Sequence, residues 1–438
     1  MDHHHESENK ELAAQLRKHA YALEDDGFEP LIERIGDARL VLLGEASHGT
    51  SQFYTARTHL SKRLIREKGF GFIGVEGDWP DCHRVDDFIK GRIAGEPEGA
   101  QILRAFERWP TWMWANVEVV LLCEWLREHN RALGAPAQVG FFGLDVYSLW
   151  DSMATVLAYL EERDPQALQA ARLAAACFEP YGFDDQAYAR ATAIVGASCE
   201  DEVVELMVRL RERSTRLSEE ARERFDLEQN AQVMLNAERY YRTMVRGGPH
   251  AWNIRDHHMM ETLDRLLERH GPDSKAIVWA HNTHIGDARA TDMAGYGMFN
   301  LGQLARERYG DDAVALVGFG SHHGSVIAGR AWGAPMERMT TPPAASGSWE
   351  EAFHLAGEHD WLLITDDLAQ SELARKVRGH RAIGVVYQPV ADRLHNYVST
   401  VLTSRYDGFV FFDQGDALHP LHTRPAHKGG LDTYPWGV

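Results

Sequence analysis

The chain contains short, continuous runs of apolar residues, separated in many places by stretches with helical periodicity. A strand covered on both faces reads as a continuous apolar run, whereas a half-exposed strand alternates between apolar and polar residues. The runs therefore predict buried strands. They cover residues 40–44, 70–75, 139–144, 276–280, 313–319, 361–364, 383–387 and 409–412. Residues 53–68 and 117–131 predict amphipathic helices between strands. The alternation indicates an α/β fold with a central mixed, mostly parallel sheet surrounded by many helices.

One long segment, from Asp145 to Lys275, has no strand pattern. Its periodicity predicts helices near residues 152–163, 165–176, 187–212, 219–245 and 253–270. We expect a helical insertion, at about residues 146–274, between the two halves of the sheet. Residues 335–348 are rich in Pro, Thr, Ala and Ser and predict a long loop. The expected organisation is an N-terminal extension with a first helix over residues 1–30, then a single α/β domain over residues 31–438.

Four of the predicted strands are followed directly by an acidic residue or a histidine. These residues are Glu45, Glu76, Asp145 and His281. Ligands of α/β sheets bind at the carboxyl ends of parallel strands, so we expect the four side chains around one cleft. Any one acidic residue after a strand is more typical of a turn or a helix cap. The four together favour a functional site.

The segment after the first of these strands suggests a general base. His48 is expected just before the N-terminus of a helix, where the positive end of the helix dipole disfavours an imidazolium ion. A neutral His48 could then accept a proton. Ser47 or Thr50 is expected to cap the helix, and Gly49 to leave space where a substrate approaches.

Two further residues have roles that the sequence leaves open. Glu45 could hold the tautomer of His48 or help to orient a water molecule. Arg57 lies on the helix that follows. It could pair with Glu45 or Glu76, bind a substrate oxygen, or lie on the surface.

Known catalytic motifs are missing from the chain, which contains no G-x-S-x-G, H-E-x-x-H or Walker A sequence. A divalent metal is an alternative, because several of the candidate residues are of ligand type. These are His48, Glu76, Asp145, His281 and His284. No compact ligand spacing enforces a metal site, so we favour water activated by histidine and glutamate.

The charge balance restricts the partners. The chain has 46 Lys and Arg against 65 Asp and Glu, a formal net charge of −19. An acidic surface repels phosphate backbones and anionic lipid, so we expect no nucleic acid and no membrane as partner. No apolar run is long enough to cross a bilayer.

The cysteines suggest a compartment. Cys82, Cys123, Cys177 and Cys199 form no C-x-x-C pair and are too sparse for a disulfide framework. This usage is typical of a reducing cytoplasm. The polar N-terminus shows no secretory signal, so we expect a cytoplasmic protein.

Motifs throughout the chain resemble the erythromycin esterase family, whose members are also described as succinoglycan-biosynthesis-like proteins. The similarity extends from about Arg34 to Leu421. The motifs are LGEASHGT at 43–50, GVEGDWPD at 74–81, FFGLDVYSLWDSM at 141–153, ERYYR at 238–242, WNIRDHHMMETL at 252–263, IVWAHNTHIGDAR at 277–289, NLGQLARERYG at 300–310 and VVYQPVADRLHNYV at 385–398.

The resemblance implies an α/β fold and metal-independent, water-mediated hydrolysis, which in the best-known members opens a macrolactone ester and so confers macrolide antibiotic resistance. It implies His48 as the general base, with Glu45, Arg57 and Glu76 as further site residues. A late-chain histidine also belongs to the family site. Both His281 and His284 are candidates, and we favour His281 because it lies directly at the strand end.

The resulting hypothesis is a hydrolase that cleaves a small-molecule carboxylic ester or lactone with activated water, without a serine nucleophile and without a cofactor. Arg57 and His281 would bind or polarise the carbonyl, and His284 and Asp145 would bind substrate. The helical insertion would form much of the pocket wall. The alternatives are a metal-dependent hydrolase that uses the same cleft, and a non-catalytic accessory or binding protein in polysaccharide production.

Overall fold

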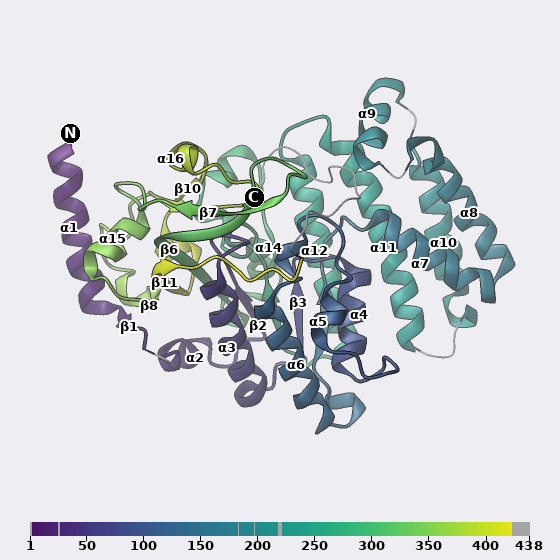
Figure 1. Ribbon diagram of the computed structural model, residues 1–438, viewed down its shortest axis with the longest axis horizontal. Helices are drawn as coiled ribbons and strands as arrows, with labels where there is room; N and C mark the ends of the chain where they lie inside the picture. Colours follow the sequence, from purple (N-terminus) through teal and green to yellow (C-terminus); the bar gives the residue numbers. More distant parts are fainter. Residues whose placement is uncertain (1, 25–26, 183, 197, 218–220, 423–438) are drawn as a thin grey trace.

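A nine-stranded sheet forms the centre of the computed structural model, which describes residues 2–24, 27–182, 184–196, 198–217 and 221–422 (Figure 1). Its strands are β1 (Tyr21–Ala22), β2 (Leu40–Leu43), β3 (Phe72–Val75), β4 (Gly140–Gly143), β5 (Ala276–Trp279), β6 (Val314–Gly329), β7 (Met336–Thr341), β8 (Trp361–Ile364) and β11 (Gly408–Gly415). They lie in the order β1-β8-β11-β6-β2-β5-β3-β4, and β7 pairs with β6 outside this path.

The sheet is mixed and mostly parallel, which confirms the predicted fold class. From β11 through β6, β2, β5 and β3 to β4, every neighbouring pair is parallel. The antiparallel pairs involve β1, β7 and β8. The strand that follows the helical insertion, β5, lies inside the sheet between β2 and β3. Strands that precede the insertion in sequence therefore alternate in the sheet with strands that follow it.

Helices cover both faces of the sheet, which explains the continuous apolar runs. Val41 and Leu43 of β2 belong to the core on one face, and Leu40 and Leu42 to the core on the other. Helices α2 (Glu29–Ile35), α3 (Ser51–Lys68), α5 (Gly99–Leu103) and α6 (Val117–Arg131) pack on the first face. Helices α1 (Asp2–His19), α12 (His250–His270), α14 (Leu301–Tyr309) and α15 (Trp349–Ala356) pack on the second. Helix α4 (Trp79–Ile89) lies beside β4 and contributes to both cores.

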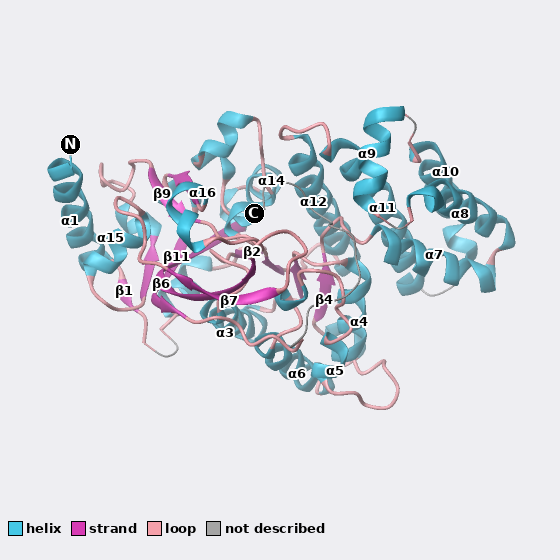
Figure 2. Cartoon of the chain, turned by 45° about the horizontal axis from the view of Figure 1, so that its top comes forward, coloured by secondary structure: helices cyan, strands magenta, loops and turns pink. Residues whose placement is uncertain are grey.

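The insertion is entirely helical in the described residues and has an apolar core of its own. Figure 2 shows its outer helices grouped beside the sheet. They are α7 (Leu149–Arg163), α8 (Pro165–Phe178), α9 (Asp185–Val195), α10 (Glu200–Leu217) and α11 (Ala221–Met244). The helix predicted over 187–212 is two helices, because Gly196 ends α9 in the left-handed conformation at φ 73°.

Other predictions fail where strands are exposed or isolated. Residues 383–387 form no strand, and their backbone pairs with other segments only through isolated bridges, such as Ser47 to Ile383. The loop predicted over 335–348 contains β7, an edge strand whose residues are partly exposed and polar. A small sheet of β9 (Arg378–Arg381) and β10 (Tyr397–Thr400) was also not predicted. A search for continuous apolar runs misses strands such as these, which are polar or partly exposed.

The domain boundary at residues 30 and 31 stays a prediction. Helix α1 of the predicted extension packs against α15. Residues 423–438 of the predicted domain lie outside the described residues. Across the part of the chain that the structure describes, no helix is both long and apolar enough to span a bilayer.

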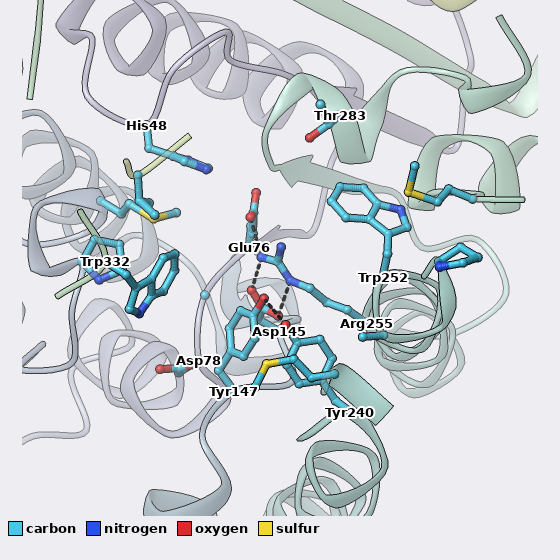
Figure 3. Close-up of a pocket in the computed structure, with 18 of the residues that line it drawn as sticks. His48, Glu76, Asp78, Asp145, Tyr147, Tyr240, Trp252, Arg255, Thr283 and Trp332 are labelled. Atoms are coloured by element: carbon cyan, nitrogen blue, oxygen red, sulfur yellow. Dashed lines mark hydrogen bonds and ion pairs between the residues drawn. The ribbon is translucent and has the colours of Figure 1, made fainter. Parts of the chain in front are cut away.

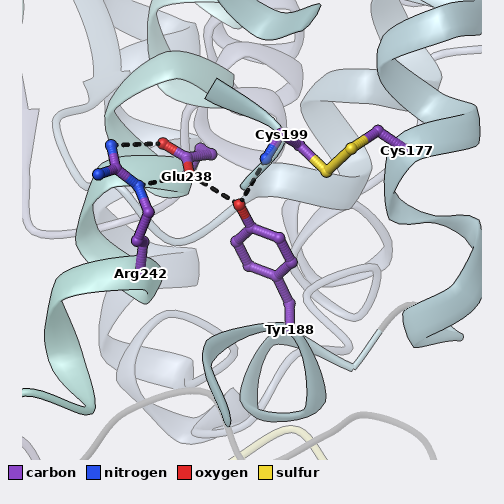
Figure 4. The surroundings of a disulfide bond; sticks show 5 residues. All are labelled: Cys177, Tyr188, Cys199, Glu238 and Arg242. Carbon is purple, nitrogen blue, oxygen red and sulfur yellow. Dashed lines mark hydrogen bonds and ion pairs between the residues drawn. A yellow bond between two sulfur atoms is a disulfide. The ribbon is translucent and has the colours of Figure 1, made fainter. Parts of the chain in front are cut away.

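The expectation about cysteines is wrong, because Cys177 and Cys199 form a disulfide (Figure 4). The turn through α9 brings their Cα atoms to 5.8 Å across a sequence separation of 22 residues. The Tyr188 hydroxyl accepts a hydrogen bond from the Cys199 amide at 2.9 Å and donates one to Glu238 at 2.7 Å. Cys82 and Cys123 are buried thiols. The disulfide removes the cysteine argument for a reducing compartment, so a cytoplasmic location stays a prediction.

The disulfide can be tested by counting thiols in the unfolded chain. Without reductant we expect two titratable thiols, because only Cys82 and Cys123 are free, and four after reduction. Reductant should lower the free energy of unfolding by about 3 kcal/mol. A variant with serine at both Cys177 and Cys199 serves as the control and should not respond to reductant. Four thiols before reduction would contradict the pairing.

Candidate functional site

A cavity of about 650 Å³ lies where four parallel strands end (Figure 3). His48, Glu76, Asp145 and Thr283, which follow β2, β3, β4 and β5, line its inner end. Its walls are apolar and aromatic. They include Phe106, Met113, Trp114, Tyr147, Tyr240, Met244, Trp252, Met293, Met298, Trp332, Val385 and Val398.

The helical insertion forms part of this wall. Tyr240 and Met244 come from the end of α11, and Trp252 and Arg255 from the start of α12. No described side chain of α7, α8, α9 or α10 lines the cavity. The expectation that the insertion forms much of the wall therefore holds for its last two helices, the segment that joins them, and Tyr147 before α7.

His48 presents one ring nitrogen to the cavity and is otherwise buried. Its Nδ1 lies 2.9 Å from Oε1 of Glu45. An ionised Glu45 accepts a hydrogen bond from Nδ1–H, so the assigned tautomer leaves Nε2 as a free acceptor. Figure 3 shows the ring directed into the cavity. His48 precedes α3, which begins at Ser51, as the sequence predicted.

The expectation that the surroundings of His48 disfavour its protonated form is wrong, because its pKa is raised. Burial lowers the pKa, but the negative charges of Glu76 and Glu45 outweigh burial and raise it above its usual value of 6.5. Two nearby carboxylates therefore stabilise the imidazolium ion more than burial and Arg255 disfavour it. His48 remains able to take up a proton, and it retains that proton to a higher pH than an isolated histidine.

Arg57 pairs with Glu45, one of the alternatives that the sequence left open. Its Nη2 donates to Oε2 of Glu45 at 2.6 Å. The guanidinium is fully buried over the rings of Tyr54 and Trp279, at 4.4 and 4.6 Å from the ring centroids. Arg57 does not line the cavity. It lies behind Glu45 and orients that carboxylate, so direct contact with a substrate carbonyl does not fit this geometry.

Ser47 and Gly49 have structural roles that differ from those predicted. The Ser47 hydroxyl forms a hydrogen bond with that of Thr50, and neither side chain caps α3. A Cβ atom at Gly49 would lie 1.9 Å from the carbonyl oxygen of Ile327 in β6. Glycine is therefore required here by close packing of two backbones, and Gly49 does not face the cavity.

Arg255 joins three of the predicted site residues, although it was not itself predicted as one. Its Nη2 donates to Oε1 of Glu76 at 2.5 Å and to Oδ2 of Asp145 at 2.7 Å. Its Nε donates to Oδ1 of Asp145 at 3.0 Å, and its Nη1 lies 3.0 Å from Nε2 of His284. All four residues are buried. Arg255 lies inside the motif at 252–263, but no local pattern marks its partners.

The neighbours of Glu76 and Asp145 keep both carboxylates ionised. Burial raises the pKa of Glu76, but His284, Arg255 and His48 outweigh burial and hold it well below its usual range. The pKa of Asp145 is also lowered, because Arg255 outweighs burial. Glu76 therefore presents a negative charge beside His48.

His281 lies behind His48. Its backbone N–H donates to Oε2 of Glu76 at 2.8 Å, and its Nδ1 accepts from the Thr283 amide at 3.3 Å. The ring lies 4.9 Å from the His48 ring and is fully buried. Burial and the charge of His48 hold its pKa well below the usual value. His281 therefore stays neutral and does not line the cavity, so direct polarisation of a carbonyl does not fit its position.

His284 lies behind Glu76 and the wall residue Trp252. Its Nδ1 lies 2.9 Å from both carboxylate oxygens of Asp256, and its ring stacks on Trp252 at 4.4 Å. Asp256 also accepts a hydrogen bond from the Leu301 amide at 2.8 Å. His284 does not line the cavity either, so its expected role in substrate binding is at most indirect. Asp145 does line the cavity.

The geometry of these residues does not fit a metal site. Among the described residues, no group of three His, Cys, Asp or Glu side chains is arranged to hold a metal ion. Arg255 takes up one oxygen atom of Glu76, both oxygen atoms of Asp145 and one nitrogen of His284. A cation already lies where a metal would have to bind. We therefore derive no catalytic step through a metal.

A second acidic group on the cavity wall was not predicted. Asp78 and Asp81, at the start of α4, both line the cavity. Arg108 donates to Asp78 at 2.5 Å. Burial and the charges of Asp78 and Asp151 raise the pKa of Asp81 to about 7.

Comparisons with known proteins agree with the motifs. The sequence model of the erythromycin esterase family matches residues 65–415. Erythromycin esterase type II of Escherichia coli is 25% identical over 334 residues, which cover 69% of this chain and 74% of that protein. Erythromycin esterase type I of Escherichia coli is 24% identical over 316 residues, which cover 68% of this chain and 74% of that protein.

Three solved structures share the fold. A Bacillus cereus protein has a TM-score of 0.78 at 19% identity and covers 95% of this chain and 99% of its own. A succinoglycan biosynthesis protein has a TM-score of 0.76 at 19% identity, with coverage of 94% and 98%. A mutant erythromycin esterase in its open conformation has a TM-score of 0.64 at 20% identity, with coverage of 90% and 95%. Likeness at these identities establishes the fold alone.

Removing the Arg255 guanidinium should destabilise the protein strongly. Arg255→Met leaves Glu76 and Asp145 buried without their cation, which typically costs about 3–5 kcal/mol. Denaturant unfolding at neutral pH measures this loss. The difference in unfolding free energy between Arg255→Met and the unsubstituted protein should narrow as the pH falls below about 4. Both carboxylates have lowered pKa values in the folded protein, so their ionised forms stabilise it above that pH, and this contribution is lost as they take up protons.

Arg209→Met is the matched control, because it removes an exposed arginine that pairs with Glu205 on α10. That change should cost only about 0.3–0.5 kcal/mol. Equal losses in the two variants would show that the buried network does not stabilise the fold.

Proposed function

The chain belongs to the erythromycin esterase family, and from this membership and the site geometry we propose that it hydrolyses a carboxylic ester or lactone with water activated by His48. One observation carries the proposal: His48 directs a free Nε2 into a large apolar cavity while Glu45 holds its Nδ1. Arg57 in turn fixes Glu45. This is the arrangement of a general base whose tautomer is set by a buried carboxylate.

In the proposed reaction, His48 Nε2 takes a proton from a water molecule as the water oxygen attacks the carbonyl carbon. The tetrahedral intermediate then breaks its bond to the ester oxygen. The imidazolium returns its proton to that oxygen, so the products are a carboxylic acid and an alcohol. In a lactone, both groups remain on one opened chain. One water molecule is consumed and His48 is regenerated.

Glu76 would support both proton transfers. Its negative charge lies near His48 and raises the histidine pKa, which stabilises the imidazolium formed during attack. Arg255 keeps Glu76 ionised and fixed in place. Glu76 would also accept a hydrogen bond from the attacking water, because it lines the same cavity.

Several features support activated water over a serine nucleophile. Among the described residues that line the cavity there is no serine or cysteine. The Ser47 hydroxyl bonds to Thr50 and not to His48. We propose no cofactor.

The cavity suits a large, apolar small molecule. Its volume of about 650 Å³ is in the range of sites for drug-sized ligands, about 300–1,000 Å³. The aromatic rings of Trp114, Trp252 and Trp332 provide apolar contact surface. Neutral esters and macrocyclic lactones are therefore the first substrates to screen.

Exchange of the proposed base should separate chemistry from folding. His48→Asn should lower kcat about 10²–10⁴-fold, because asparagine cannot take a proton from water, and should change KM little. Ser47→Ala is the matched control beside it and should retain most of the activity. Initial rates with a neutral ester in the presence of a chelator measure both.

Three outcomes would contradict the proposal. An acyl-enzyme trapped on Ser47 would show a covalent mechanism. Activity that is lost on chelation and restored by one divalent ion would favour the metal-dependent alternative. A folded protein that binds esters or lactones but hydrolyses none would favour a binding or accessory role.

The pH dependence should report the neighbours of His48. The base must be neutral to act, and its pKa is raised, so kcat/KM should fall with decreasing pH through a midpoint above 6.5. Asp81 has a pKa of about 7, so it titrates in the same pH range as His48. If His48 causes the fall of kcat/KM with decreasing pH, that fall should persist in Asp81→Asn. A midpoint at or below 6.5 would contradict the assigned neighbours.

A further inference from the structure

A second, smaller cavity of about 180 Å³ lies between α4, α11, α12 and the edge strand β4. Its lining concentrates positive charge in a chain whose formal net charge is −19. Four cationic side chains and two histidines line it, namely Lys90, Arg92, Arg222, Arg269, His83 and His270, against the one carboxylate of Asp86. No role of this cavity in ester hydrolysis follows from the first site.

The carboxylates nearby are shared among several donors. Asp86 pairs with Lys90 at 2.6 Å and with Arg92 at 3.3 Å, and it also accepts the Phe141 amide at 3.1 Å. Asp87, just outside the cavity, pairs with Arg92 and with Arg222. Asp226 lies 3.4 Å from Nδ1 of His83 and accepts a hydrogen bond from the Trp79 indole N–H at 2.7 Å. Each of these carboxylates is therefore already engaged by more than one donor.

Arg269 has no such partner. Among the described residues no carboxylate lies within ion-pair distance of its guanidinium, which donates to the carbonyl oxygen of Ala221 at 3.3 Å and lies 4.5 Å over the ring of Phe225. The buried Nε of Arg222 also has no hydrogen-bond partner in the described part of the chain. The donors of the side chains around this cavity therefore exceed the acceptors that serve them.

The electrostatics agree with this geometry. Burial and the charges of Arg222 and Arg92 lower the pKa of Arg269, although Asp86 and Asp226 oppose them. Burial also lowers the pKa of Lys90, with Arg92 and Arg222 adding to it and Asp86 opposing it. An anion between these groups would relieve their repulsion.

We propose that this cavity binds a small oxyanion of the phosphate type. Guanidinium groups present paired N–H donors that match the oxygens of such an anion, and Lys90 adds a point charge. A volume of about 180 Å³ suits a phosphoryl group and not the large apolar ligand of the first cavity. The phosphoryl group can come from inorganic phosphate or from a phosphomonoester whose remainder extends out of the cavity.

Residues of α4, α11 and α12 line both cavities. Figure 1 labels these three helices. Helix α12 carries Arg255 in the first and Arg269 in the second, which lie about 21 Å apart along a helix at 1.5 Å per residue. Helix α11 carries Tyr240 in the first and Arg222 in the second. A bound oxyanion would therefore hold together the ends of helices whose other ends form the wall of the candidate active site.

Calorimetric titration with inorganic phosphate, against sodium chloride at equal ionic strength, tests the proposal. The unsubstituted protein should bind phosphate in preference to chloride. Arg269→Gln should weaken phosphate binding about tenfold, as loss of a charge-assisted contact predicts. Arg172→Gln, at an exposed arginine of α8, should bind as the unsubstituted protein does.

Thermal unfolding without phosphate shows whether Arg269→Gln folds, and the half-exposed Arg92→Gln provides a second variant in case it does not. Tighter binding of a phosphomonoester than of phosphate would identify the larger metabolite as the source of the anion. Absence of phosphate binding, or equal affinity in Arg269→Gln and Arg172→Gln, would overturn the proposal. The readout is binding, so it does not depend on ester hydrolysis.

Discussion

The buried guanidinium of Arg255 connects the helical insertion to the ends of the central strands. It comes from α12 and donates to Glu76 after β3 and to Asp145 after β4, and it lies against His284 after β5. Ionised carboxylates are stable in such a buried position only when a cation pairs with them. The ion pairs of Glu76 and Asp145 and the docking of α12 on the strand ends therefore share one side chain.

The site is built in two layers. His48, Glu76 and Asp145 face the cavity, whereas Glu45, Arg57, His281, His284 and Asp256 lie behind them. The residues of the outer layer act through the inner one: Arg57 fixes Glu45, Glu45 fixes His48, and Asp256 fixes His284. Buried hydrogen bonds of this kind set the tautomer and orientation of a histidine more firmly than solvent does.

The two cavities have opposite character. The larger is apolar with carboxylates at its inner end and on one wall, and the smaller is cationic with one carboxylate. Residues of α4, α11 and α12 line both cavities, so the carboxylates of the larger cavity and the cationic side chains of the smaller one lie at different positions along the same helices. The negative net charge therefore describes the protein as a whole but not each site. It argues against binding of extended nucleic acid backbones, but it does not argue against binding of a small oxyanion in a cationic cavity.

The sequence by itself determined most strands of the central sheet and the polar residues that follow them. Continuous apolar runs are a local consequence of a sheet covered on both faces, so β2, β3, β4, β5 and β8 were predictable, and with them Glu45, Glu76, Asp145 and His281. Only the tertiary structure decided which of these face the cavity. Arg255 meets Glu76 across 179 positions, and Cys177 meets Cys199 only because α9 turns the chain back. Such contacts, and the pKa shift that Glu76 causes at His48, arise from packing between distant segments, which no local periodicity encodes.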